Sequence, residues 1–140
     1  MGNECDNWFQ ITCNDITTIQ KIYSELMHMR NLSDEDDKTY GFRDITITDT
    51  TLTARGLTKR NPPIEEFKKW LAYPSVHLTA LYKDEFLQFA GRIIDDVQEH
   101  VDFETVTSDD VRNATSGILY ALHEKLHLAD HMDDEWRNDN

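Results

Sequence analysis

The 140-residue sequence predicts a single α+β domain that ends in an acidic helix. Two observations support this prediction. Apolar residues switch repeatedly between a period of two, which is typical of strands, and a period near 3.6, which is typical of helices. Cap and turn residues separate these segments. At this length, a hydrophobic content of 39% is enough to form one core.

The first half of the chain supplies a strand, a helix and one or two further strands. Residues 7–13 are rich in aromatic and branched side chains and are expected to form a strand. In residues 14–29, isoleucines recur at helical spacing, with Asn14 or Asp15 as the N-cap. After a polar, acidic loop, the alternation in residues 44–56 predicts two short strands or one bent strand.

The next elements are a helix and a hairpin. Segment 61–75 is predicted to be helical because its prolines fit a first helical turn and Pro74 prevents continuation. Acidic residues near its start and lysines near its end suit the helix dipole. Residues 75–82 and 86–94 are then expected to form two strands joined by a short turn.

The last predicted element is one long helix over about 108–136. Thr107 or Ser108 is a suitable N-cap, and acidic residues follow in the first turn. Gly117 weakens the prediction slightly. The apolar residues that keep helical spacing are Val111, Ile118, Leu122, Ala129 and Trp136.

The middle of the chain carries a recognisable pattern. Its positions are Thr58, Lys59, Pro62, Pro63, Ile64, Tyr73, Pro74, Tyr82, Phe89, Ala90 and Gly91. With an Asn-x-Cys-x-Asn start at Asn3, Cys5 and Asn7, this pattern resembles the YubB-like, ferredoxin-like-domain family of small phage- and plasmid-borne accessory proteins. The resemblance covers residues 3–94 and implies a ferredoxin-like β-α-β-β-α-β core, here with an extra strand. It implies no catalytic residues. We therefore divide the single domain 1–140 into this core and an acidic extension over 95–140.

Charge is concentrated in the extension. The formal net charge is -13, and residues 95–140 contain 13 acidic and only 3 basic side chains. Such a field repels phosphate, so direct nucleic-acid binding is not expected, whereas a basic protein surface would be attracted.

Two further features concern location. No segment approaches the ~18 apolar residues of a membrane span. Cys5 and Cys13 lie eight residues apart in an extended segment, beyond the reach of a disulfide, and free thiols are typical of a reducing cytoplasm. We expect a cytoplasmic protein that makes no membrane contact.

Residues 123–127 match the zinc-protease pattern His-Glu-x-x-His. On one continuous helix, His123 and His127 would share a face, and Glu124 would act as general base. The helical wheel places both histidines and His131 away from the apolar stripe. The sequence therefore leaves three interpretations: a solvated polar face, a metal site formed by His123, His127 and Asp130, and a catalytic zinc site.

Two weaker patterns also have competing interpretations. The basic residues Arg55, Lys59, Arg60, Lys68 and Lys69 could contact phosphate or form a mixed-charge surface, and the second is favoured because acidic residues lie among them. Cys13 could be a nucleophile with His28 or His77 as base, but a small buried hydrophobe is the better interpretation.

Resemblance and charge together predict a non-enzymatic accessory protein without cofactors, which inhibits a host protein that has a basic, nucleic-acid-binding surface. Its carboxylates would mimic phosphates locally. The expected contact residues are Asp95, Asp96, Glu99, Asp130, Asp133, Asp134 and Glu135, and a further acidic cluster spans Asp34–Asp37. The alternatives are a zinc-dependent hydrolase that uses the His-Glu-x-x-His string and a ligand-binding module on the sheet face. The sequence leaves open whether the protein forms a homodimer.

Overall fold

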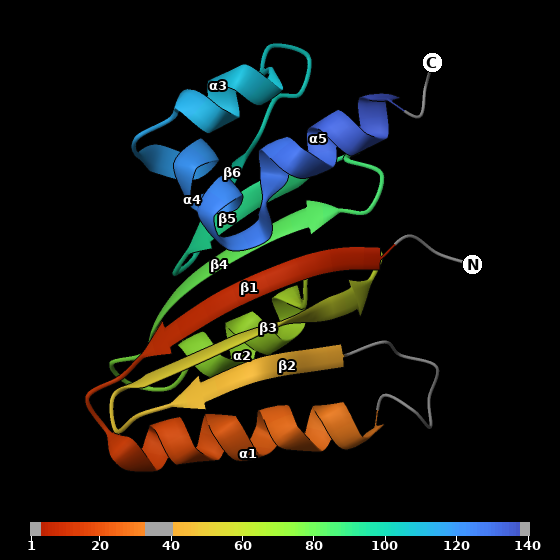
Figure 1. Ribbon diagram of the computed structural model, residues 1–140. Helices are drawn as coiled ribbons and strands as arrows, with labels where there is room; N and C mark the ends of the chain where they lie inside the picture. The colour runs from red at the N-terminus through yellow and green to blue at the C-terminus, as the bar shows by residue number, and fades with distance from the viewer. Residues whose placement is uncertain (1–3, 33–40, 138–140) are drawn as a thin grey trace.

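Figure 1 shows the computed structural model, which describes residues 4–32 and 41–137. Within these residues the chain forms a six-stranded antiparallel sheet in the order β2-β3-β1-β4-β5-β6, and the α+β class is confirmed. The strands are β1 (Glu4–Thr12), β2 (Gly41–Ile47), β3 (Thr51–Lys59), β4 (His77–Asp84), β5 (Ala90–Ile94) and β6 (Val97–His100). The helices are α1 (Ile16–Leu32), α2 (Ile64–Leu71), α3 (Ser108–Asn113), α4 (Gly117–Leu126) and α5 (Leu128–Arg137).

Strand β1 lies at the centre of the sheet and pairs along its length with β3 and β4. Its side chains alternate between the two faces, as strand geometry requires. On one face, Phe9 is fully buried and its ring centroid lies 5.6 Å from that of Phe42, 5.5 Å from Phe67 and 5.6 Å from Trp70. These contacts hold α2 and the edge strand β2 on a shared aromatic core.

A second core lies on the opposite face, between the sheet and α3–α5. It is formed by Leu81, Leu87, Ala90, Val111, Leu122, Leu126, Leu128, Ala129 and Met132. Strand β4 contributes Tyr82 to the first core and Leu81 to the second, so its last residues are buried on both faces. The sheet is thus sandwiched at β4, whereas α1 lies beside β2 and β3 (Figure 1).

The predicted N-cap of α1 is confirmed as Asp15. Its Oδ1 accepts a hydrogen bond from the backbone N–H of Thr17 (3.0 Å), and its Oδ2 accepts one from the Thr18 hydroxyl (3.2 Å). Both cysteines are free, as the sequence predicts, and both are buried. Among the described helices, none combines the length and apolar character needed to cross a membrane.

The prediction of a single helix over 108–136 is wrong, because the segment folds as α3, α4 and α5. The chain is extended at Ala114, and Gly117 then adopts a positive φ of 81°. A second break follows at His127, which has the left-handed φ of 55°. The expected cap at Thr107 is present: its hydroxyl accepts from the N–H of Asp110 (3.1 Å), and the Asp110 carboxylate accepts from the N–H of Thr107 (2.9 Å).

The edge strand β6 was not predicted because its sequence is short and polar and lacks an apolar alternation. It pairs with β5 through a turn at Asp95, whose φ is 55°. A glycine is required at position 91 beside it, because a Cβ there would overlap the Tyr82 hydroxyl and the Glu99 carbonyl oxygen.

Candidate functional site: the acidic layer and the α1–α2 cleft

Helices α3–α5 and the segment that leads into them from β5 form an acidic layer, which lies at the top of Figure 1. Residues 95–134, the part of the layer whose side chains the structure describes, contain 11 acidic and 2 basic side chains. The exposed acidic residues are Asp96, Asp102, Glu104, Asp109, Asp110, Glu124, Asp130 and Asp134. The layer is therefore held by apolar side chains on its sheet side and presents carboxylates on its outer side.

Both basic side chains of the described layer contact groups next to them. Arg112 reaches the carboxylates of Asp133 (2.6 Å) and Asp130 (3.0 Å), and these hydrogen bonds raise the pKa of its guanidinium. Lys125 lies 4.9 Å from the ring centroid of Trp8 and 3.8 Å from the Glu124 carboxylate. The remaining outward charge is negative.

The predicted contact residues have different roles in the structure. Asp95 accepts from the N–H of Leu78 (2.9 Å) and pairs with His77 (3.4 Å), so it shapes the β5–β6 turn. Glu99 accepts two hydrogen bonds from the Arg92 guanidinium, at 3.0 and 2.8 Å. These carboxylates serve mainly to hold the sheet edge.

The other predicted contact residues lie on or near the outer surface. Asp130 and Asp133 share Arg112, whereas Asp96 and Asp134 are exposed. The side chain of Glu135 and the cluster Asp34–Asp37 lie outside the described part of the chain.

The geometric basis of the proposed metal site is absent. His127 follows the end of α4 in a left-handed conformation, so it does not continue the helical face of His123. The Nδ1 of His123 already accepts from the N–H of Ala129 (3.3 Å), and Asp130 pairs with Arg112. Among residues 4–32 and 41–137, no three His, Cys, Asp or Glu side chains are placed to hold a metal ion.

His131 is not part of a solvated polar face, contrary to the helical wheel. Its Nε2 lies 2.7 Å from the Glu85 carbonyl oxygen and its Nδ1 lies 2.7 Å from the Lys83 ammonium. Since an ammonium only donates, Nδ1 accepts and Nε2 carries the proton. Burial lowers the pKa of Lys83, while nearby Asp6 opposes this shift. His131 therefore ties α5 to β4.

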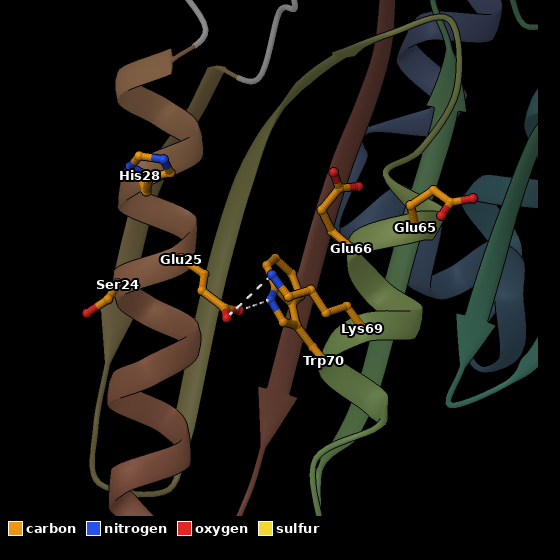
Figure 2. Close-up of a pocket in the computed structure, with 7 residues that line it drawn as sticks. All are labelled: Ser24, Glu25, His28, Glu65, Glu66, Lys69 and Trp70. Atoms are coloured by element: carbon orange, nitrogen blue, oxygen red, sulfur yellow. Dashed lines mark hydrogen bonds and ion pairs between the residues drawn. The ribbon is translucent and has the colours of Figure 1, made fainter.

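A cleft of about 560 Å³ separates α1 from α2 (Figure 2). It is lined by Ser24, Glu25, His28, Glu65, Glu66, Lys69 and Trp70. The Glu25 carboxylate accepts from the Trp70 indole N–H (2.8 Å) and the Tyr73 hydroxyl (3.0 Å), and Lys69 lies 3.5 Å away. Because Trp70 is only 1% exposed, this arrangement joins the two helices and leaves no accessible aromatic face for a ligand.

A smaller hollow of about 300 Å³ lies where β1 ends and β3 and β4 begin, and Cys13 and His77 both line it. Cys13 is 4% exposed and its thiol lies 3.4 Å from the Ser75 hydroxyl, whereas His77 pairs with Asp95. His28, the other proposed base, lies in the α1–α2 cleft instead. The interpretation of Cys13 as a small buried hydrophobe agrees with this burial.

The predicted basic cluster is divided between two faces of the sheet. Arg55 projects from β3 on the face that also carries Asp6 and Trp8, since it bonds to Asp6 at 3.2 Å. Lys68 and Lys69 lie on α2, which covers the other face. Sequence proximity alone does not show this separation.

Comparison of the chain with protein-family profiles, with curated proteins and with solved structures gives no match.

Proposed function

We propose that this protein is a non-enzymatic accessory protein of phage or plasmid type, which binds and inhibits a host protein through its acidic layer. The observation that supports this function is the orientation of charge: both described cations of the layer contact neighbouring carboxylates or Trp8, while eight acidic residues remain exposed. Such a surface attracts a basic partner and repels nucleic acid.

The partner in this proposal is a host protein whose basic surface normally binds nucleic acid, for example in a defence system. Exposed carboxylates would occupy positions that phosphates take on that surface. The Arg112 guanidinium contacts the carboxylates of both Asp130 and Asp133 and so holds these two negative charges next to each other. Asp96, Asp109 and Asp134 are further exposed carboxylates of the acidic layer.

We also propose that β1–β4 with α1 and α2 form a ferredoxin-like core. The strand order β2-β3-β1-β4, antiparallel throughout, and the β-α-β-β-α-β element order support this assignment. That fold hosts many functions, so it does not by itself select one. The two free thiols support a location in the host cytoplasm.

The test is capture of partners from bacterial lysate by the tagged protein, followed by a DNA competition assay. We expect a captured protein that binds duplex DNA when alone, and this protein should lose DNA when the acidic protein is added. Binding should weaken as salt rises, because charge attraction between surfaces is screened over about 10 Å at 0.1 M salt.

Two matched variants make this test specific. Asp109→Lys with Asp134→Lys reverses two exposed charges of the acidic layer, and capture should fall by about tenfold or more. Asp49→Lys with Glu65→Lys makes the same change in net charge elsewhere and should leave capture intact. Equal loss in both variants, or a partner that keeps its DNA, would contradict the proposal.

A further inference from the structure

The second face of the sheet is covered by α4 over β4, β5 and β1, whereas its continuation over β2 and β3 is polar. We call this continuation, together with Gln10 of β1 at its border, the open face and define it by Gln10, Arg43, Thr46, Thr53 and Arg55. Strand pairing places these side chains on the same side as Trp8. In Figure 1 no helix lies in front of this part of the sheet.

Two arginines stand directly opposite each other on the open face. Arg43 of β2 and Arg55 of β3 are register partners, so their side chains leave the sheet side by side. Like charges in this position destabilise a sheet unless another charge compensates. Among the described residues, no carboxylate forms an ion pair with Arg43, which is exposed.

Arg55 has an incomplete set of partners. One of its terminal nitrogens lies 3.2 Å from the Asp6 carboxylate, but its Nε is buried and has no hydrogen-bond partner. Asp6 is shared, because Lys83 lies 3.7 Å from the same oxygen. The Asp6 carboxylate is thus shared by two cations, Arg43 stands beside Arg55 without an ion pair among the described residues, and the buried Nε–H of Arg55 is an unused donor next to the open face.

We propose that the open face binds the dianionic phosphate group of a small phosphomonoester, between Arg43 and Arg55. A group that carries about two negative charges at pH 7 matches the unbalanced charge, and its three terminal oxygens can accept from both guanidiniums. The Thr46 and Thr53 hydroxyls bond to each other beside this pair, and the accepting hydroxyl keeps its own hydrogen for a ligand.

Charge on the rest of the molecule selects a small ligand over a polymer. The protein carries a net charge of -13, and the acidic layer lies on the same side of the sheet as the open face. A nucleic-acid strand long enough to fill the open face would also meet this layer, whereas a single phosphate group would not. This inference is independent of the protein partner proposed above.

The experiment is an NMR titration of the full chain at constant ionic strength, with chloride replaced by each probe. Inorganic phosphate and glycerol 3-phosphate should give saturable shifts at the amides of β2 and β3 near Arg43 and Arg55. Whichever of these two probes binds with the lower dissociation constant identifies the natural ligand as free phosphate or as a phosphate ester. Dimethyl phosphate, a monoanionic diester, should bind about tenfold more weakly because only one charge is compensated.

Variants separate a built site from general attraction. Arg43→Gln removes an exposed side chain, should fold normally, and should weaken phosphate binding about tenfold. Lys68→Gln removes an exposed cation from α2 on the other face and should have no effect. The inference is overturned if the shifts do not saturate, if the diester binds as well as the monoester, or if the two variants behave alike.

Discussion

Cys5 is a fully buried thiol at the start of β1, and its surroundings favour the protonated form. Burial raises its pKa to about 12, with the carboxylates of Asp84 and Asp6 adding to the shift against a hydrogen bond that lowers it. A thiol in this state is a poor nucleophile. Its neighbours Asn7 and Thr58 bond to each other (2.9 Å), so the residues of the sequence pattern here form a buried structural cluster.

This pKa sets a pH dependence of stability. A folded-state pKa raised from 9.0 to about 12 stabilises the fold below pH 9, and this contribution is lost as the pH rises from 9 towards 12. Between pH 9 and about pH 10.5 the wild type should lose roughly 2 kcal/mol more than Cys5→Ala. Urea unfolding at both pH values measures the difference.

A second residue-scale prediction concerns Asp6, which joins Arg55 and Lys83. Asp6→Ala leaves two cations close together with side chains only 28% and 10% exposed, and should cost about 3 kcal/mol of unfolding free energy. Lys83→Met removes a buried charge and keeps the Asp6–Arg55 pair, but it also removes the donor to His131 Nδ1, and it should cost about 1 kcal/mol, less than Asp6→Ala. Similar losses in both variants would contradict this order.

At the scale of elements, the most informative feature is the break at His127. A non-glycine residue with a φ of 55° is costly, by about 1 kcal/mol, and glycine relieves this cost. His127→Gly should therefore stabilise the protein by about 0.5–1 kcal/mol in urea unfolding. Glu124→Gly, inside α4, should instead destabilise it by about 1 kcal/mol. A destabilising His127→Gly would indicate a continuous helix at this position.

The sequence predicted the elements whose apolar pattern is strong and missed those set by tertiary contacts. Strand β1 and helix α2 agree with their patterns because each has a single buried face or stripe. The helix end at His127 could not be predicted from the sequence, because a left-handed residue that ends a helix is usually a glycine or asparagine and not a histidine. The contacts of His131 with the Lys83 ammonium and the Glu85 carbonyl join residues that are 48 and 46 positions apart in the sequence. A helical wheel cannot show contacts of this kind.

The sequence predicted the location of one candidate site but not the other. Counting charges located the acidic layer, but not the role of Arg112 in pairing Asp130 with Asp133. The opposition of Arg43 and Arg55 depends on strand register across a bulge, and spacing along the chain does not show it.

At the scale of the whole molecule, net charge opposes folding. A charge of -13 on 140 residues produces self-repulsion, and salt screens this repulsion. Raising NaCl from about 10 to about 200 mM should increase stability by about 1 kcal/mol, which is a few degrees in a thermal melt. The Asp109→Lys and Asp134→Lys variant should show a smaller increase, because its low-salt repulsion is already reduced. An unchanged melting temperature would show that repulsion is negligible in the folded state.

The central place of β1 affects how the chain is made. Both of its pairing partners, β3 and β4, follow it in the sequence, and β4 begins only at His77. During synthesis, β1 therefore leaves the ribosome long before its second neighbour exists, with one pairing edge unfilled. Closure of the sheet, and then docking of α3–α5, must wait until most of the chain has been translated. A pause placed before β4 would prolong the interval in which this edge can pair with another nascent chain.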